Sequence, residues 1–254
     1  MNDHCFYLAG ASPALLYARK ALEHRGCDLA QEPEEDVTHL LLPAPGFEAP
    51  GMIRGGLPLA PLLEKLPKNI TVLGGSLDTP ELDGYRKADF LRDPMYLSQN
   101  AVITAHCAVK EMLNRLPVTA QDCPILVIGW GRIGKSLARL LAAMGARVSI
   151  ATRKPEDRAM LHALGYGAVD TARLGANLMC YRVIFNTAPY PVLGEAQIRH
   201  CRPDCLKIDL ASRPGISGGD VVWARGLPGK DAPETSGRLI AATAIRLAAA
   251  EGTL

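Results

Sequence analysis

The sequence predicts an α/β protein with two parallel-sheet domains joined by a long helix. Short apolar runs alternate with helix-like stretches through the first 95 residues, and the same alternation returns from about residue 119. Between the two regions, residues 98–116 form one long helical pattern, which Pro117 should end. Alternating strands and helices favour parallel sheets, because parallel neighbours need a crossover connection. The expected parts are residues 1–97, 98–117 and 118–254.

The first region contains three candidate buried strands. They are short and apolar, with turn residues on the C-terminal side, and are CFYLAG (5–10), VTHLLLPA (37–44) and ITVLGG (70–75). A helix is predicted over 13–25, because Ser12 suits the N-cap, Pro13 the first turn and Gly26 the end. A shorter helix is expected over 59–66. This βαβαβ order predicts a flavodoxin-like parallel sheet.

The second region continues the alternation to the end of the chain. Strands are expected at 124–129, 147–152, 167–169, 182–187, 206–211 and 220–224, and helices at 132–144, 155–164 and 236–251.

Composition excludes several classes of protein. The 254 residues are 48% apolar and 21% charged, which is typical of globular domains, and the net charge of +2 comes without a clustered basic face for nucleic acid. We find no signal peptide and no apolar run of membrane-spanning length, so we expect a cytoplasmic protein that binds neither nucleic acid nor membrane.

The seven cysteines are an odd number without a repeating framework, which indicates reduced thiols. Cys201 and Cys205 lie beside His200 and suggest a metal site. A second ligand pair at recognisable spacing is missing from the sequence, so we expect no metal.

A glycine motif follows the apolar run PILVIG. Gly129, Gly131 and Gly134 form G-x-G-x-x-G before an amphipathic helix and a second strand. In such a motif the first glycine makes the tight turn, the second admits a pyrophosphate and the third lets helix and strand pack closely. The context therefore predicts a dinucleotide-binding Rossmann domain. The intervening residues Trp130, Arg132 and Ile133 are expected to contribute to the cofactor site.

The second strand of this unit ends in Thr152, Arg153 and Lys154. NAD enzymes usually carry an acid here that binds the ribose 2′-OH, whereas enzymes that take the 2′-phosphate carry Arg. A hydroxyl and two cations would accept that phosphate, so the predicted cofactor is NADP. The alternative is a solvated Arg-Lys pair with NAD held by backbone contacts.

The later strands end in small, polar or glycine-rich segments, which we expect to be loops beside the cofactor. Asn186, Thr187 and Ala188 are predicted to contact the cofactor. Two of the segments carry cations that suit a small carboxylate substrate, and the predicted substrate residues there are Ser212, Arg213, Gly229 and Lys230. Each segment could equally be an ordinary turn of the fold.

The connecting helix begins NAVITAHCAV, and its N-terminal amides, Asn100 and Thr104 are expected to face the substrate. His106 is the candidate general acid or base, since imidazole titrates nearest neutral pH. A structural or surface histidine is the alternative, and the catalytic base is otherwise unassigned.

Taken together, NAVITA, VIGWGRIGKSLARLLAAMGARV, FNTAP, IDLASRPG and GLPGKDAPETSG resemble the family of NADP-dependent dipicolinate synthase subunits over residues 98–240. The resemblance implies oxidation of a dihydrodipicolinate-type heterocycle to dipicolinate with NADP, in dipicolinic acid biosynthesis during sporulation. It also implies a small dicarboxylate substrate and, as partner, the flavoprotein-like second subunit of the synthase. An oligomer is expected.

One motif departs from the family. Its helix opening usually reads N-[AS]-[IV]-P-T-A-E-G, whereas here Ile103 replaces the proline and His106-Cys107 replace Glu-Gly. His106 is therefore a candidate stand-in for the glutamate.

Two other functions fit the residues. A 2-hydroxyacid or alanine dehydrogenase would use Arg213 with a distal histidine, but no histidine follows residue 226. A non-catalytic, nucleotide-sensing subunit would keep the glycine motif and lack turnover.

Overall fold

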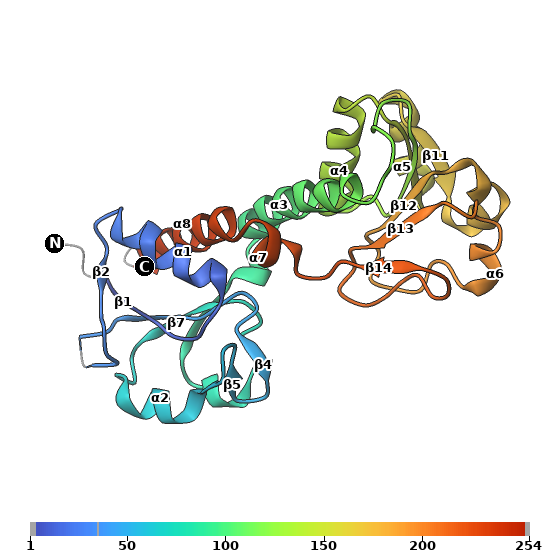
Figure 1. The fold of residues 1–254 in the computed structure, drawn as a ribbon. Coiled ribbons are helices and arrows are strands. Elements are labelled where there is room, and N and C mark those ends of the chain that lie inside the picture. The colour runs from blue at the N-terminus through green and yellow to red at the C-terminus, as the bar shows by residue number, and fades with distance from the viewer. Residues whose placement is uncertain (1–3, 35, 252–254) are drawn as a thin grey trace. The chain divides into compact units, whose positions relative to one another are not determined.

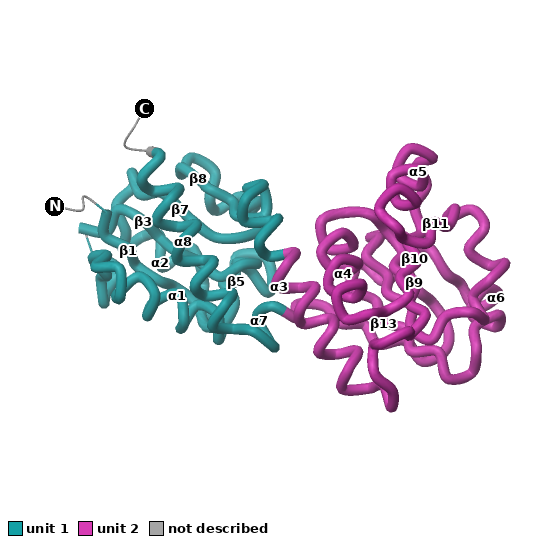
Figure 2. Tube along the Cα trace, turned by 90° about the horizontal axis from the view of Figure 1, so that it is seen from above, with its two compact units in different colours: residues 1–100, 228–254 teal, residues 101–227 magenta. Residues whose placement is uncertain are grey.

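The structure is a computed structural model that describes residues 4–34 and 36–251. Figure 1 shows its fold, and Figure 2 colours the two compact units into which it divides. Unit 1 comprises the chain up to Asn100 together with the part from Pro228 onward, and unit 2 comprises Ala101–Leu227.

Unit 1 contains a parallel sheet in the order β2-β1-β3-β7-β8. Its strands are β1 (Cys5–Leu8), β2 (Asp28–Leu29), β3 (His39–Leu41), β7 (Thr71–Gly74) and β8 (Arg86–Asp89). Strands β1, β3 and β7 correspond to the three predicted runs. The strand order reverses beside β1, as in flavodoxin-like sheets, so the predicted fold class is confirmed.

Helix α1 (Pro13–Glu23) forms for the predicted reasons. The Ser12 hydroxyl accepts a hydrogen bond from the Leu15 N–H at 3.1 Å, and Pro13 occupies the first turn. Gly26 follows the helix with a positive φ of 69°, a conformation that glycine adopts without strain. Helix α2 (Leu59–Lys65) also lies where it was predicted.

Several short elements of unit 1 carry too little periodicity to be predicted. Strands β4 (Phe47–Ala49), β5 (Met52–Ile53) and β6 (Leu57–Pro58) form a small antiparallel sheet. Two 3₁₀ turns, η1 (Pro80–Leu82) and η2 (Phe90–Arg92), flank β8. A run of two or three residues contains no repeat from which a strand can be recognised.

Helix α3 (Pro94–Leu113) begins four residues earlier than predicted. The Asp93 carboxylate accepts from the Tyr96 N–H at 2.7 Å and caps the first turn. Asn100 therefore lies inside the helix, and its neighbourhood does not supply the free N-terminal amides that the sequence analysis placed there. The helix contributes residues to both units.

Helix α8 (Pro233–Glu251) packs along α1 in unit 1 (Figure 1). Gly237 permits this close approach, because an added Cβ would lie 2.5 Å from the carbonyl oxygen of Ala14. The sequence pattern predicts this helix as part of the dinucleotide-binding domain, whereas it belongs to unit 1. Its Ala-rich face matches either unit, so the sequence pattern alone could not assign it.

Unit 2 contains a parallel sheet of the predicted strands in the order β11-β10-β9-β12-β13-β14. The strands are β9 (Pro124–Ile128), β10 (Arg147–Thr152), β11 (Gly167–Asp170), β12 (Val183–Asn186), β13 (Leu206–Asp209) and β14 (Val221–Trp223). The helices are α4 (Arg132–Ala143), α5 (Pro155–Ala163) and α6 (Glu195–Ile198), with 3₁₀ turns η3 (Thr171–Ala176) and η4 (Leu178–Cys180). Helix α7 (Leu227–Asp231) begins at the last residue of unit 2 and belongs from Pro228 onward to unit 1.

The central strands of unit 2 are buried on both faces. Every residue of β12 and all of β9 after Pro124 are buried, as expected for a covered parallel sheet. Helix α4 packs on β9 and β10, and α5 packs on β10 and β11. The order reverses between β9 and β12, so the carboxyl ends of these two strands form the topological switch point where α/β sheets bind ligands.

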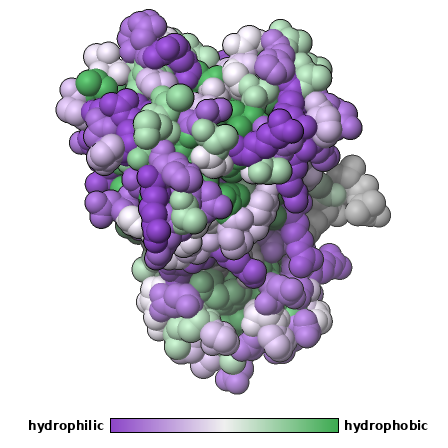
Figure 3. Space-filling view, turned by 90° about the vertical axis from the view of Figure 1, so that its right-hand side faces the viewer, coloured by the Kyte–Doolittle hydropathy of each residue, from purple (hydrophilic) through white to green (hydrophobic). Residues whose placement is uncertain are grey.

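The face shown in Figure 3 carries hydrophobic residues in small groups among hydrophilic ones. Within the described residues, every helix is too short or too polar to cross a bilayer.

Candidate dinucleotide-binding site

The glycine turn joins β9 to α4 at the switch point. Gly129 has a φ of +105°, which strongly favours glycine, and its N–H donates to the Ala151 carbonyl at 2.9 Å. A Cβ at Gly129 would lie 2.4 Å from the Thr187 hydroxyl oxygen. That hydroxyl donates to the Ile128 carbonyl at 2.9 Å, so the turn is held against the segment after β12.

The other two glycines have different surroundings. A Cβ at Gly134 would lie 2.1 Å from the Gly129 carbonyl oxygen, so a side chain there would push α4 away from the turn. Gly131 is the exposed N-cap of α4, and a Cβ there would meet no described atom within 4 Å. The third glycine thus permits close packing, and the second leaves open space in front of the helix.

The first turn of α4 is suited to an anion. Gly131 has no side chain to cap the helix, and the first turn contains no acidic residue. The backbone N–H groups of a helix N-terminus attract negative charge, as a pyrophosphate requires. Of the other predicted motif residues, Arg132 is exposed and Ile133 is half-buried.

The Trp130 ring makes two contacts with neighbouring side chains. Its ring meets Tyr166 in an edge-on arrangement with the centroids 6.1 Å apart, and the Lys135 ammonium lies 5.6 Å from the Trp130 ring centroid. The predicted cofactor residue Trp130 therefore links the glycine turn to the segment before β11.

The strand end after β10 is organised by side chains of α5. Thr152 is buried, and its hydroxyl donates to the Asp157 carboxylate at 3.2 Å. Arg158 donates to the carbonyls of Thr152 and Arg153 at 3.0 and 2.8 Å. Thr152 thus supports the turn, whereas Arg153 and Lys154 are exposed and remain the groups that can meet a ligand.

Arg153 also contacts the segment after β12. Its guanidinium carbon lies 5.0 Å from the ring centroid of Tyr190, which is 37% exposed. Sequence reasoning missed Tyr190, although an aromatic residue four positions after a strand at the switch point was the available clue. The two side chains bring the carboxyl-end segments of β10 and β12 together.

Asn186 and Asp209, the last residues of β12 and β13, form a buried polar pair. The Asn186 amide donates to Asp209 at 2.9 Å and to the Ala188 carbonyl at 3.0 Å, and it accepts from the Ala188 N–H. Asn186 is fully buried and Ala188 is 4% exposed, whereas Thr187 is half-buried. Asn186 and Ala188, which were predicted to contact the cofactor, are therefore buried and hydrogen-bonded to each other.

Asp209 holds the loop that follows β13. Its carboxylate accepts from the N–H groups of Ala211, Gly215 and Ile216 at 3.0, 2.7 and 2.9 Å. This loop presents Ser212 and Arg213, both exposed. The role of Asp209 cannot be predicted from the sequence, because it depends on backbone groups that only the folded loop brings together.

The remaining substrate candidates are distributed between the units. Gly229 and Lys230 lie in α7 rather than in a loop, because Leu227 is buried and Pro228 is compatible with a first helical turn. They belong with Asn100 to unit 1. Thr104 is buried and His106 is exposed, and both belong to unit 2.

The cysteines beside His200 are buried thiols. Burial raises the pKa of Cys205 to about 12, with Cys201 adding to the rise, and burial also raises the pKa of Cys201. His200 is exposed. The part of the chain that the structure describes contains no group of three or more side chains arranged to hold a metal ion.

Known proteins are similar to the chain in sequence and in fold. No family model matches the chain. A dipicolinate synthase subunit of Bacillus subtilis (strain 168) is 29% identical over 160 residues, which cover 60% of this chain and 54% of the relative. The chain thus matches about half the length of that relative.

Two solved structures show how far the fold is shared. The corresponding dipicolinate synthase subunit of Bacillus halodurans has a TM-score of 0.85 at 23% identity, with 97% of each chain covered. D-Lactate dehydrogenase of Escherichia coli has a TM-score of 0.59 at 16% identity, with 98% of this chain and 97% of that chain covered. The resemblance to this dipicolinate synthase family that the sequence motifs indicated is confirmed.

Proposed function

We propose that this chain is an oxidoreductase of the dipicolinate synthase type, which oxidises a dihydrodipicolinate-type heterocycle to dipicolinate with NADP. The observation that carries the proposal is the sequence match to a dipicolinate synthase subunit over 160 residues. The glycine turn of unit 2 supports it, since its geometry suits a dinucleotide. The strand end after β10 supports the choice of cofactor, and the loop after β13 supports the class of substrate.

The described residues fit a bound dinucleotide. The open space at Gly131 and the uncapped first turn of α4 would receive the pyrophosphate. Bound NADP would supply the hydride acceptor of the oxidation. Arg153 and Lys154 would pair with the 2′-phosphate, because they place two cations at the strand end where NAD enzymes usually carry an acid.

Two of the three acids near this strand end, Asp157 and Asp170, have side-chain partners. Glu156 and Asp157 lie in the first turn of α5, and Asp157 is hydrogen-bonded to Thr152. Arg158 also lies on α5 and pairs with Asp170 at 3.4 Å. The exposed charges of Arg153 and Lys154 therefore favour a phosphate at this position over a neutral ribose.

The loop after β13 would orient the substrate. Asp209 fixes the loop backbone, so Arg213 is displayed from a rigid base and can pair with a carboxylate of the heterocycle. Ser212 offers a hydroxyl beside it. For Asn100, Thr104 and Lys230, contact with the substrate stays a prediction from the sequence.

Oxidation to an aromatic ring also releases a proton, and His106 is the candidate to accept it. His106 is exposed on α3, and this position holds glutamate in the family's usual motif. Replacing His106 with Gln should lower turnover and leave NADP affinity unchanged. If turnover is unchanged, another group takes the proton.

The partner we propose is a flavoprotein-like second subunit. The relative's name identifies it as one subunit of its synthase, which implies at least one other chain in that enzyme. We propose the same arrangement here, with the complete activity depending on both chains.

The decisive experiment is a turnover assay. The purified chain is mixed with dihydrodipicolinate and NADP, with and without the flavoprotein-like partner, and the pyridine dicarboxylate absorbance is followed. We expect product under at least one condition. NADP binding without turnover under both conditions would exclude the enzyme and favour a nucleotide-sensing role.

A 2-hydroxyacid dehydrogenase is the competing enzyme, because D-lactate dehydrogenase shares the fold. It would use a carboxylate-binding Arg with a histidine and an acidic partner. Assaying small 2-oxo acids with NADPH and NADH distinguishes the two: reduction of a 2-oxo acid without dipicolinate formation would overturn our proposal.

A further inference from the structure

Unit 2 contains a groove at the amino ends of its strands, opposite the candidate dinucleotide site. The groove has a volume of about 610 Å³, which is within the usual range for small-molecule sites. Pro124, Arg147 and Gly167 line it, and each is the first residue of its strand (β9, β10 and β11). The groove therefore lies at the amino ends of strands whose carboxyl ends carry the candidate dinucleotide site.

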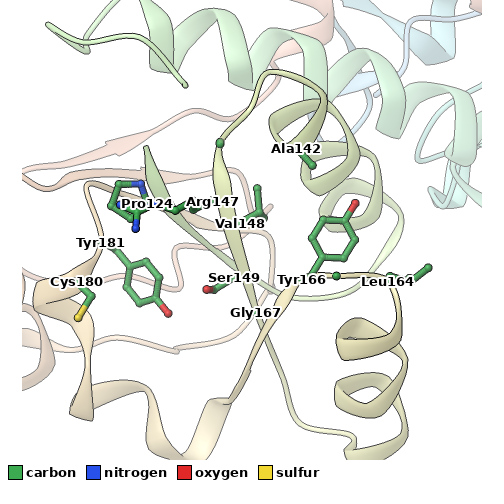
Figure 4. Close-up of a pocket in the computed structure, with 12 residues that line it drawn as sticks. Pro124, Ala142, Arg147, Val148, Ser149, Leu164, Tyr166, Gly167, Cys180 and Tyr181 are labelled. Atoms are coloured by element: carbon green, nitrogen blue, oxygen red, sulfur yellow. The ribbon is translucent and has the colours of Figure 1, made fainter. Parts of the chain in front are cut away.

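The lining combines aromatic surface with one guanidinium group. Tyr166 and Tyr181 are both half-buried, and Figure 4 shows Ser149 lying between their rings in that view. Leu164 adds apolar surface with 56% of it exposed. Two tyrosines with neighbouring apolar groups favour a flat, apolar ligand, because aromatic rings pack well against one another.

The charge of the groove is positive. Arg147 is exposed, and its Nε donates to the Asp122 carbonyl at 2.9 Å, which anchors the guanidinium group. That bond uses one of five donors, and a carboxylate needs two from the fork. The described residues that line the groove include no Asp or Glu.

We propose that this groove binds a planar aromatic carboxylate. The ring would lie against Tyr166 and Tyr181, the carboxylate would pair with Arg147, and the Ser149 hydroxyl would donate a hydrogen bond. The assignment does not depend on the proposed oxidoreductase activity, because its residues are separate from the glycine turn and from the loop after β13.

A pair of rings joins the groove to the glycine turn. Tyr166 lines the groove and also meets Trp130, with the ring centroids 6.1 Å apart. A ligand packed on Tyr166 changes the surroundings of Trp130, so binding should alter the fluorescence of this tryptophan. The chain contains two tryptophans, and replacing Trp223 with Phe leaves Trp130 as the reporter.

The test uses the full chain carrying Trp223→Phe, titrated with isophthalate without NADP. We expect a saturable change in Trp130 fluorescence. Benzamide, which has the ring without the charge, should bind at least tenfold more weakly. Adding Arg147→Gln should weaken isophthalate binding at least tenfold, and Arg147→Lys, which keeps the charge and loses the fork, should give an intermediate affinity.

Arg199→Gln in the same background is the matched control, because Arg199 is also exposed and lies outside both the groove and the proposed substrate loop. It should leave isophthalate binding unchanged. If Arg213→Gln, in the proposed substrate loop, removes the response and Arg147→Gln does not, the ligand occupies the substrate site and the proposal is wrong.

A second readout does not depend on tryptophan. Cys180 is an exposed free thiol that lines the groove. Saturating isophthalate should slow its alkylation by iodoacetamide, measured by mass spectrometry, and Arg147→Gln should remove this protection. Unchanged fluorescence together with unchanged Cys180 alkylation would overturn the assignment. Neither readout requires turnover or NADP, so failure here is distinguishable from failure of the proposed function.

Discussion

The guanidinium carbon of Arg153 lies 5.0 Å from the ring centroid of Tyr190. The contact joins the end of β10 to the segment after β12, on either side of the glycine turn that follows β9. A cation held over an aromatic face is partly immobilised, so less conformational entropy is lost when it meets a phosphate. We therefore expect the pair to set the preference for NADP.

Replacing Arg153 and Lys154 together with Ala should remove this preference. Charge-assisted hydrogen bonds contribute about 1.5–3 kcal/mol each, so we expect the loss of both cations to raise the NADP Kd roughly 100- to 10,000-fold. NAD binding should change little, because it lacks the 2′-phosphate. Calorimetric titration of both nucleotides measures the ratio, with Arg199→Ala as an exposed control. An unchanged NADP-to-NAD ratio would show that our account of this strand end is wrong.

Tyr190→Ala should have a smaller effect in the same direction. An exposed cation–π contact contributes about 0.5–1 kcal/mol, which corresponds to a roughly two- to fivefold weaker NADP affinity. Tyr190→Phe keeps the aromatic face and should bind NADP as the unmodified chain does. Equal losses in the Ala and Phe variants would assign the effect to the hydroxyl instead.

Gly131→Ala and Gly134→Ala should separate binding from folding. The Gly134 variant places a methyl group 2.1 Å from the Gly129 carbonyl oxygen and should lose about 1–3 kcal/mol of unfolding free energy. The Gly131 variant meets open space and should unfold within about 1 kcal/mol of the unmodified chain. It should nevertheless bind NADP weakly, because the methyl group fills the space that we assign to the pyrophosphate. Full NADP affinity in the Gly131 variant would argue against that position.

Asp209→Asn should destabilise unit 2. The substitution keeps the volume but replaces one acceptor oxygen with a donor among the N–H groups of Ala211, Gly215 and Ile216. A buried donor left unsatisfied costs about 1–3 kcal/mol, so we expect a loss of about 2–3 kcal/mol in urea unfolding. Amide hydrogen exchange should accelerate in 210–216. The exposed Asp220→Asn is the control, and equal effects at both positions would contradict the role of Asp209.

Cys205 should resist alkylation in the folded chain. Its pKa of about 12 keeps the thiol protonated at about pH 8, whereas Cys180 is exposed and should react with iodoacetamide. The pKa of Cys205 in the folded chain is higher than the ordinary value of 9.0, so the thiol of the unfolded chain is deprotonated at a lower pH than that of the folded chain. Its contribution to stability is therefore complete below pH 9.0 and is lost as the pH rises towards about 12. Rapid native alkylation of Cys205 would show that the site is open.

Much of unit 2 was predictable because its residues act locally. The spacing of Gly129, Gly131 and Gly134 after an apolar run requires one backbone geometry, and the turn has the positive φ and the close contacts that this geometry implies.

Other residues could not be assigned without the fold. Thr152 and Asn186 were expected to face the cofactor, but both are buried and their hydrogen bonds go to neighbouring segments. Tyr190 lies 37 residues after its partner Arg153 in the sequence. Sequence periodicity describes neighbours along the chain and carries no information on such pairs.

The sequence by itself determined the two parallel sheets, the glycine turn and the absence of an acid at the end of β10. Each of these features depends on residues that lie close together in the sequence. Tertiary structure decided which side chains are available for binding. It buried Thr152 and Asn186, joined Arg153 to Tyr190, and packed the final helix on α1. These outcomes depend on contacts between distant segments, where the geometry of packing selects one partner among several that the sequence would allow.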